Sequence, residues 1–213
     1  MDDKKRVCIS FIGAGKAGVS LGAYFRSKGL EISGYLSRSR KSAISAAELT
    51  SSKAFTALSD LAAASDIIIV STPDGAIAEV WEELRKCDIR DRIVCHLSGS
   101  LSSDIFDGIA AKSSFGYSVH PMFAFSGKDG YFEGVEKACF TLEGAKEKLG
   151  EVREIFMHTG NRIFVIDKSK KALYHASNVM VSNLVTALLS IGTESFEKCG
   201  VKKEEAIEAL LPL

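Results

Sequence analysis

Five polar side chains in the C-terminal part of the sequence recur at helical spacing and could do acid–base chemistry. Lys171, Tyr174, His175, Asn178 and Ser182 lie at offsets of 0, 3, 4, 7 and 11 residues. Such offsets fall on one side of an α-helix. Histidine exchanges protons near neutral pH, and lysine can do so when burial lowers its pKa. We interpret this row, the polar stripe, as the wall of a cavity. A solvated face and hydrogen bonds within the core are the alternatives.

Three further polar residues lie where predicted strands end. His96 and His120 each close an apolar run, and Ser98 follows His96 by two residues. Site residues collect at the carboxyl ends of strands in open α/β sheets. We expect His120 or His175 to act as acid or base, with Ser98 and Asn178 orienting a substrate. A structural role for each histidine is the alternative.

The N-terminal part carries a glycine pattern that could bind a diphosphate. Gly13, Gly15 and Gly18 follow the apolar run 7–12 in G-x-G-x-x-G spacing and open an amphipathic segment. Gly13 permits a tight turn, Gly15 lets the diphosphate approach the backbone, and Gly18 lets the helix pack closely. The helix N-terminus favours negative charge. The pattern predicts a dinucleotide site, and a glycine turn that serves packing alone is the alternative.

The end of the second predicted strand selects between NADP(H) and NAD(H). NAD sites usually place an acidic residue there, whereas this sequence has the basic run S-R-S-R-K at 37–41. Hydroxyls and cations suit a 2′-phosphate, because arginine binds phosphate oxygens bidentately. We therefore predict NADP(H). The alternative is a solvated basic turn in which Ser39 caps the next helix. The predicted contacts are Gly13, Ala14, Gly15, Lys16, Ala17, Gly18, Ser37, Arg38, Ser39, Thr72, Pro73 and Asp74.

Strands and helices alternate along most of the chain. Predicted strands span 7–12, 32–36, 53–55, 66–71, 92–97, 115–120, 138–142 and 162–166. After a first helix that ends near Gly29, predicted helices span 42–49, 58–64, 76–86 and 145–158. One more, with Ser102 or Ser103 as its cap, runs to about Ala111. Pro73 could be the first residue of the helix that follows it. A polar, glycine-rich loop is expected at 128–136. The alternation implies a doubly wound, mostly parallel α/β sheet, a Rossmann domain over residues 1–166.

The pattern changes after residue 166. Helical periodicity without proline runs over 168–198, with Gly200 as a C-terminal cap and another helix over 202–211. We expect residues 167–213 to be the start of a helical domain that is truncated here or completed by a partner subunit. A homodimer through this domain would cover its apolar faces.

Composition excludes several classes of protein. The 213 residues carry 27 basic and 27 acidic side chains, so the formal net charge is zero, which argues against nucleic-acid binding. Five scattered cysteines without C-x-x-C spacing indicate neither a disulfide framework nor a metal site. We see no apolar leader and no run of transmembrane length. The expectation is a soluble, reduced, cytoplasmic protein without a membrane partner.

Several stretches together resemble a known family. They are F-I-G-A-G-K-A-G, Y-L-S-R-S, S-D-I-I-I-V-S-T-P-D, H-L-S-G-S-L-S-S, H-P-M-F-A-F-S and K-x-L-Y-H-A-S-N-V-M-V-S-N. The sequence resembles Rossmann-like NADP-dependent oxidoreductases that carry a C-terminal helical domain of unknown function. That group is similar to pyrroline-carboxylate reductases, deazaflavin-dependent NADP reductases and the 6-phosphogluconate dehydrogenase superfamily.

The resemblance implies an active site between the Rossmann domain and the long helix. It carries over Ser98, His120, Lys171, Tyr174, His175 and Asn183 as candidates for that cleft. The related 3-hydroxyacid dehydrogenases use a K-x-x-x-N pair on the equivalent helix. Here Lys171 is followed four residues later by His175, which leaves the proton donor open.

These observations predict an oxidoreductase that transfers hydride between NADP(H) and a small carbonyl, imine or hydroxy-acid substrate. The catalytic candidates are Ser98, His120, Lys171 and His175. The substrate-binding candidates are His96, Tyr174, Asn178 and Asn183. No metal is expected. The alternative is a non-catalytic NADP-binding or redox-sensing module. An S-adenosylmethionine methyltransferase is disfavoured, because the ribose of that cofactor carries no phosphate to match the basic run.

Overall fold

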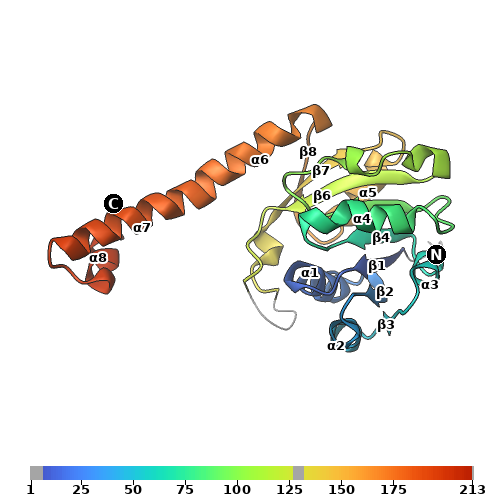
Figure 1. Cartoon of the computed structure of the whole chain (residues 1–213), viewed down its shortest axis with the longest axis horizontal. Coiled ribbons are helices and arrows are strands. Elements are labelled where there is room, and N and C mark those ends of the chain that lie inside the picture. Colours follow the sequence, from blue (N-terminus) through green and yellow to red (C-terminus); the bar gives the residue numbers. More distant parts are fainter. Residues whose placement is uncertain (1–6, 127–131, 213) are drawn as a thin grey trace. The chain divides into compact units, whose positions relative to one another are not determined.

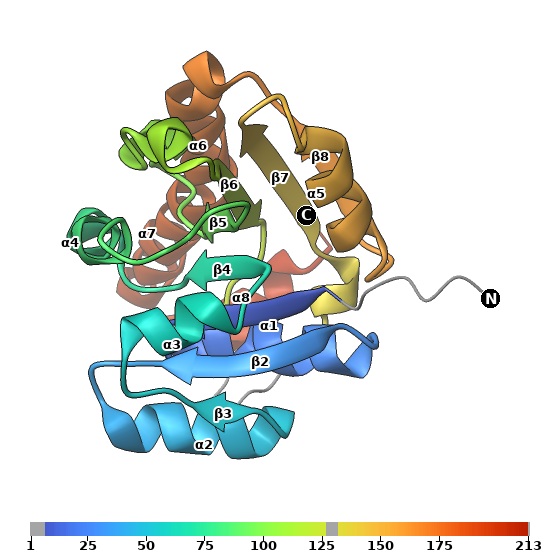
Figure 2. The same cartoon turned by 90° about the vertical axis from the view of Figure 1, so that its right-hand side faces the viewer.

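The computed structural model describes residues 7–126 and 132–212. One sheet contains eight strands in the order β3-β2-β1-β4-β5-β6-β7-β8, and Figure 2 shows its first strands side by side. The strands are β1 (Cys8–Ile12), β2 (Glu31–Leu36), β3 (Lys53–Ala54), β4 (Ile67–Val70), β5 (Ile93–His96), β6 (Phe115–Pro121), β7 (Cys139–Gly144) and β8 (Arg162–Val165). Neighbours run parallel except β6 and β7, which are antiparallel. The predicted fold class, a mostly parallel α/β sheet, is confirmed.

Five α-helices flank this sheet (Figure 1). They are α1 (Lys16–Ser27), α2 (Arg40–Thr50), α3 (Leu58–Ala63), α4 (Asp74–Leu84) and α5 (Leu149–Met157). Buried residues of α1, α2 and α5 share one core cluster with the sheet. Those of α3 and α4 share a second cluster with it. The sheet is therefore covered on both faces, as expected of parallel strands.

The central strand β4 explains why this arrangement is stable. All four of its residues are completely buried. Ile67 and Ile69 belong to the first core cluster, while Ile68 and Val70 belong to the second. Alternate side chains of a strand point to opposite faces, so β4 has a core on each side. Burial of each such side chain contributes about 1.5–3 kcal/mol.

The segment after β5 departs from the sequence prediction. The helix expected to run to about Ala111 is two 3₁₀-turns, η1 (Ser103–Ile105) and η2 (Ile109–Lys112). Gly108, with φ of +72°, separates them, because a continuous right-handed helix cannot pass through that conformation. Ser102 caps η1 by accepting a hydrogen bond from the Asp104 N–H at 3.3 Å.

Other helix starts also differ from the prediction. Pro73 occupies the N-cap of α4 and is not its first residue. Helix α5 begins at Leu149, with Lys148 as its N-cap, and not at residue 145. Residues 127–131 of the predicted loop lie outside the described residues, and its end contains the 3₁₀-turn η3 (Val135–Lys137).

The predicted long helix is present but is not uniform. It consists of η4 (Lys168–Lys170), α6 (Lys171–Val179), the π-helical segment η5 (Met180–Leu184) and α7 (Val185–Lys198). Gly200 follows the C-cap with φ of +87°. The Val201 N–H donates to the Phe196 carbonyl at 3.1 Å and the Gly200 N–H to the Glu197 carbonyl at 3.0 Å. This is the glycine-terminated C-cap that the sequence predicted. Helix α8 (Lys203–Leu210) follows.

This helix corrects one sequence prediction. The 31-residue run Lys168–Lys198 is long and apolar enough, by length and composition alone, to cross a membrane. The statement that no run reaches transmembrane length was therefore wrong by that criterion. A single helix of this kind is a weak indication of a membrane span, since the core helix of a soluble protein passes the same test.

The chain forms two compact units, Met1–Lys171 and Ala172–Leu213. The first contains the sheet, the helices on its two faces and the first residue of α6. In the second, α7 and α8 pack together, with Thr193 and Ala206 buried.

Candidate functional site

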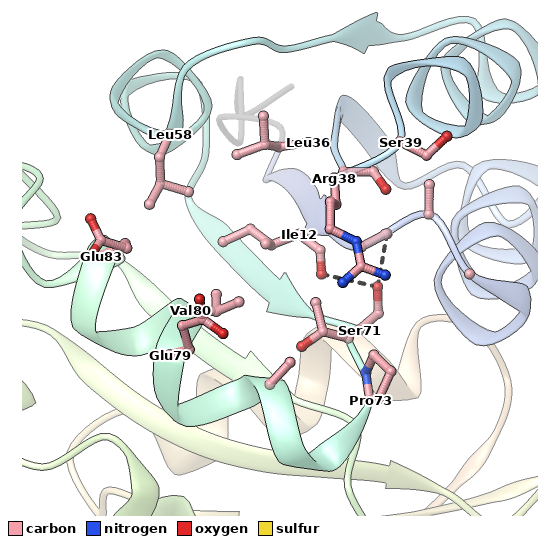
Figure 3. Close-up of a pocket in the computed structure, with 16 residues that line it drawn as sticks. Ile12, Leu36, Arg38, Ser39, Leu58, Ser71, Pro73, Glu79, Val80 and Glu83 are labelled. Carbon is pink, nitrogen blue, oxygen red and sulfur yellow. Dashed lines mark hydrogen bonds between the residues drawn. The ribbon is translucent and has the colours of Figure 1, made fainter.

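The glycine turn between β1 and α1 packs closely against the end of β4. Gly13 has φ of +111°, and a Cβ there would lie 2.9 Å from the carbonyl carbon of Ser71. A Cβ on Gly18 would lie 2.3 Å from Ser71 Oγ. That hydroxyl donates to the Gly13 carbonyl at 3.0 Å, as the dashed lines in Figure 3 mark. Gly13 and Gly18 thus permit the close packing that the G-x-G-x-x-G spacing predicts.

Gly15 stands in open space at the N-terminus of α1. Among the described residues, and apart from its chain neighbours and its own helix, no atom would lie within 4 Å of a Cβ on Gly15. Gly15 is the N-cap residue of α1, and no side chain of the described residues caps this helix. The first N–H groups of an α-helix have no partner within the helix. The turn therefore presents N–H groups without a partner in the helix, and the positive end of the helix dipole, to a space that the described residues leave open.

A cavity of about 620 Å³ opens beside this turn (Figure 3). It is bounded by the carboxyl ends of β1, β2 and β4 and by side chains of α3 and α4. Its lining residues are Ile12, Gly13, Ala14, Gly15, Leu36, Ser37, Arg38, Ser39, Leu58, Ser71, Thr72, Pro73, Ala76, Glu79, Val80 and Glu83. Of the predicted cofactor contacts, Lys16, Ala17, Gly18 and Asp74 lie outside this lining.

Arg38 and Ser39 form the polar wall of the cavity where β2 ends. The Arg38 side chain is exposed and extends across the opening in Figure 3. Ser39 is the N-cap of α2, and its Oγ accepts a hydrogen bond from the Ser42 N–H at 3.3 Å. The capping role considered for Ser39 is therefore real, and it coexists with a place in the cavity wall. Arg40, on the first turn of α2, is exposed and is not part of the lining.

Two acidic side chains that the sequence analysis missed face the same cavity. Glu79 and Glu83 lie one turn apart on α4, and both are drawn at the cavity in Figure 3. The signal was available: α4 follows the T-P-D turn, and residues four apart lie on one helix face. With Leu58 and Val80, they make the wall opposite Arg38 partly acidic and partly apolar.

His96 is completely buried, and both of its ring nitrogens are engaged. The Ser98 N–H donates to Nδ1 at 3.2 Å, so Nδ1 carries no proton. Nε2 lies 3.2 Å from the Ser102 carbonyl, to which the neutral ring can donate. Burial is the main reason that the pKa of His96 falls to about 4. His96 is thus a neutral residue that holds the turn after β5.

Asp74, Ser98 and Ser100 form a hydrogen-bonded group that joins the first residue of α4 to the loop after β5. The hydroxyls of Ser98 and Ser100 donate to Asp74 Oδ2 at 2.7 Å and 2.8 Å. Ser98 Oγ also accepts from the Ser100 N–H at 3.1 Å and the Leu101 N–H at 3.0 Å. The predicted catalytic candidate Ser98 therefore organises its own loop. Asp74 and Ser100 present the more exposed polar atoms.

Lys171, a predicted catalytic candidate, is connected to the same loop through Ser118. Lys171 is 2% exposed, and its Nζ donates to Ser118 Oγ at 2.6 Å. Ser118 Oγ in turn donates to the Ser98 carbonyl at 3.3 Å. Burial is the main cause of the fall in the pKa of Lys171 to about 8, and the carboxylates of Glu143 and Asp74 oppose it. At pH 7 the amine is therefore still mostly protonated.

His120 lies beside Gly99 where β6 ends. A Cβ on Gly99 would lie 2.8 Å from His120 Nε2, so the ring packs directly on the glycine backbone. The side chain is half-buried. Ser118 precedes His120 by two residues on β6, so the two side chains point to the same face of the sheet. That period of two is a signal from which Ser118 could have been predicted.

The remaining candidates belong to the second unit. Tyr174, His175 and Asn178 lie on α6 and are half-buried, and Asn183 lies in η5 and is exposed. Ser182 Oγ, at the end of the polar stripe, donates to the Asn178 carbonyl at 2.6 Å and to Asn183 Oδ1 at 2.9 Å. The contribution of these four candidates to a site stays a prediction.

Residues 7–126 and 132–212 contain no group of three or more His, Cys, Asp or Glu side chains that could hold a metal ion.

The sheet order, the glycine turn with its cavity and the helical C-terminal region define a Rossmann-type α/β protein. Comparison with protein-family models agrees: a Rossmann-like domain matches residues 2–121. A domain of unknown function, DUF2520, matches residues 138–213. The chain belongs to this Rossmann-like family. No match was found among curated protein sequences.

Solved structures with the same fold include several reductases. Protein TM1727 from Thermotoga maritima is 30% identical, with a TM-score of 0.74 over 96% of this chain and 75% of that one. A reductive aminase from Aspergillus terreus, solved with NADPH and ethyl-5-oxohexanoate, is 15% identical, with a TM-score of 0.77 over 98% and 72%. A pyrroline carboxylate reductase from Plasmodium falciparum, solved with NADP, is 14% identical, with a TM-score of 0.68 over 97% and 75%.

Proposed function

We propose that this protein is an NADP(H)-dependent oxidoreductase that acts on a small carbonyl, imine or hydroxy-acid substrate. The observation that carries the proposal is the cavity of about 620 Å³ that joins the glycine turn to Arg38. The space at Gly15 and the N–H groups of α1 fit a diphosphate. Arg38 and Ser39 fit a 2′-phosphate, and the S-R-S end of β2 has no acidic residue to bind a free 2′-hydroxyl.

The relatives support this choice of cofactor and reaction. The reductive aminase and the pyrroline carboxylate reductase, both with the same fold, were solved with NADPH and NADP. When bound, such a cofactor supplies or accepts hydride, and the protein supplies orientation and a proton. In the reducing direction, the carbon of a C=O or C=N group gains the hydride. Its oxygen or nitrogen then gains the proton.

His120 is our first candidate for the group that gives that proton. It is half-buried at the carboxyl end of β6, beside the loop that Asp74 and Ser98 organise. An imidazole can carry a proton at neutral pH and release it. His175 on α6 is the second candidate. Lys171 is buried and donates to Ser118. We therefore assign it an indirect role, as a cation that supports the loop after β5 through Ser118.

Binding and turnover test the proposal separately. Isothermal titration of the full chain should give tighter binding of NADPH than of NADH. Absorbance of the reduced cofactor should then fall in the presence of some members of a panel of ketones, cyclic imines and keto acids. Equal binding of the two cofactors would remove the NADP(H) assignment. Tight NADPH binding without turnover on any substrate would favour the redox-sensing module instead.

We also propose that the protein is a cytoplasmic homodimer. The second unit exposes large apolar side chains, among them Leu173, Val181, Leu188 and Leu211, each more than three-fifths exposed. Apolar surface on this scale marks an interaction site. A second copy fits better than a membrane, because Glu194, Glu197 and Lys198 lie in the last turns of α7. Within the residues that the structure describes, no disulfide joins any of the five cysteines, as suits a reducing compartment.

A further inference from the structure

Glu143 is a carboxylate buried in the sheet, on β7. It is 1% exposed, and its two oxygens accept from Ser103: Oε1 from the backbone N–H at 2.9 Å and Oε2 from the hydroxyl at 2.7 Å. A buried carboxylate is costly unless it is hydrogen-bonded and its charge is compensated. The reaction proposed above assigns no role to this residue.

Glu143 and Lys171 both adjoin Ser118. Ser118 is the register partner of Glu143 across the β6–β7 pair, and its hydroxyl accepts from Lys171 Nζ at 2.6 Å. Two buried charges of opposite sign therefore lie close to one strand residue. Among the charges that favour the protonated form of Lys171, Glu143 has the largest effect and Asp74 the next.

The two charges hold opposite ends of one loop. The loop 98–104 begins at Ser98, whose carbonyl accepts from Ser118 and so connects to Lys171. It nearly ends at Ser103, which Glu143 holds with two hydrogen bonds. Between these points lies Ser100, which donates to Asp74. An ion pair between Lys168 and Asp104 at 2.7 Å adds little, because both side chains are more than half exposed.

We propose that Glu143 is a positioning residue, which with Lys171 forms a buried charge clamp on the loop 98–104. Glu143 holds Ser103 and supplies the negative charge that keeps Lys171 cationic, and Lys171 holds Ser98 through Ser118. The clamp itself does not depend on the proposed function. Its consequence does: it would keep Ser98 and Ser100 in place beside the substrate of the proposed reaction.

Other titratable groups around Lys171 do not replace Glu143. Asp74 lies at the start of α4 and already accepts from two serine hydroxyls. His96 on β5 is neutral at pH 7, because burial lowers its pKa to about 4. Lys168 is itself a cation, and Glu143 is among the charges that raise its pKa. Removal of the Glu143 charge therefore removes the more effective of the two negative charges that favour protonated Lys171 and leaves Asp74.

The first experiment follows the titration of Lys171 in the full chain by NMR of ¹³Cε- and ¹⁵Nζ-labelled lysine. The Lys171 signal is the one absent from Lys171→Met. In Glu143→Gln we expect its titration midpoint to fall by about one pH unit, which is a tenfold larger ratio of neutral to protonated amine at a given pH. Glu147→Gln, which removes an exposed carboxylate just after β7, is the matched control and should leave the midpoint unchanged. A midpoint in Glu143→Gln that equals that of the wild type overturns the clamp.

A second experiment separates the hydrogen bonds of Glu143 to Ser103 from the effect of its charge on Lys171. Ser103→Ala removes a hydroxyl that Glu143 accepts from but leaves both charges. We expect faster hydrogen exchange at the Leu101 N–H, which donates to Ser98 Oγ in the wild type, with no shift in the Lys171 midpoint. If exchange at Leu101 is unchanged, Glu143 does not hold the loop.

A double-variant cycle keeps the proposal testable if Glu143→Gln is poorly folded. The double variant Glu143→Gln with Lys171→Met removes both charges together, and a buried charge is most costly when its partner alone is lost. The urea midpoint of the double variant should lie above that of either single variant. Additive losses would overturn the clamp. None of these measurements needs cofactor or substrate, so the clamp can hold even if the proposed reaction fails.

Discussion

A Cβ atom on Gly18 would lie 2.3 Å from Ser71 Oγ and 2.9 Å from the Gly13 carbonyl oxygen. The first helix thus meets the end of β4 without room for a side chain. One of the two atoms that a Cβ would strike belongs to the backbone of the glycine turn. Because the turn and the N-terminus of α1 bound the cavity, this contact links the packing of the sheet to the proposed binding of a diphosphate.

Replacement of Gly18 by alanine should therefore affect both stability and binding. Overpacking of this kind costs about 1–3 kcal/mol of the free energy of unfolding. A shift of the turn should also weaken NADPH binding. The matched control is Gly150→Ala in α5, where a Cβ would meet no atom of the described residues within 4 Å beyond its chain neighbours and its own helix. That substitution should stabilise the helix slightly. Urea unfolding and NADPH titration of both variants check this. A Gly18→Ala protein as stable as the control would contradict the contact.

Arg38 should decide the preference for the phosphorylated cofactor. Its guanidinium is the only cationic side chain in the cavity lining described above, and a charge-assisted hydrogen bond contributes about 1.5–3 kcal/mol. Arg38→Ala should weaken NADPH binding by about 10- to 100-fold and leave NADH binding nearly unchanged. Arg40→Ala, two residues on and outside the lining, is the control. Equal losses for NADPH and NADH in Arg38→Ala would mean that this side chain does not bind the 2′-phosphate.

The proton donor should be identified by comparison of the histidines. His120→Gln should lower kcat by about 10²–10⁴-fold, the usual contribution of a general acid, with a smaller effect on NADPH affinity. His175→Gln tests the second candidate in the same assay. His158→Gln changes an exposed residue and is the control. Turnover that survives loss of both His120 and His175 would exclude both from proton transfer.

The parts of the fold that local chemistry determines were predictable. The glycine turn was predicted because only glycine tolerates φ of +111° at residue 13 and the contact at residue 18. Gly200 was predicted for the same reason, since its φ is +87°. The antiparallel β6–β7 pair was not predicted, although a signal existed. Parallel neighbours need a crossover, usually a helix, and the loop expected over 128–136 offered none.

Contacts that residue type and spacing do not reveal account for most of what the sequence analysis missed in the site. Glu143 interrupts an apolar strand, which indicates a paired buried charge, but its partner Ser103 lies 40 residues away. His96 was a candidate for substrate contact, and its spacing from Ser98 and Ser102 does not reveal that the backbone engages both ring nitrogens. The π-helical segment in the long helix could not be predicted, because the spacing of apolar residues there is the same as in an α-helix.

The exposed apolar side chains of α7 should form the interface of a homodimer. We expect light scattering to give twice the mass of one chain for the wild type. Leu188→Glu, at a position that is 68% exposed, should give the monomer, because a charge buried in an apolar interface is costly. Ser190→Glu, about 200° further round the helix, is the control. A monomeric wild type would contradict the dimer, and flotation of the wild type with liposomes would indicate a membrane partner instead.

His96 should make the sheet unit lose stability as pH falls below neutrality. Burial lowers its pKa to about 4, whereas an unfolded chain has histidine near the usual value of about 6.5. Between these values the unfolded state binds the additional proton, so the contribution of His96 is present above about pH 6.5 and is lost as pH falls toward 4. About 2 kcal/mol of the unfolding free energy should be lost in this way between pH 7 and pH 5. Fluorescence of the buried Trp81 reports unfolding of this unit in urea.

The variant His96→Gln separates this effect from the titration of carboxylates. Glutamine keeps a donor for the Ser102 carbonyl but does not titrate, so the variant should lose less stability than the wild type over the same pH range. His158→Gln removes an exposed histidine and should keep the wild-type slope. If His96→Gln shows the wild-type slope as well, the imidazole is not held neutral. The two hydrogen bonds assigned to its ring nitrogens would then need a different arrangement, because a protonated Nδ1 cannot accept from the Ser98 N–H.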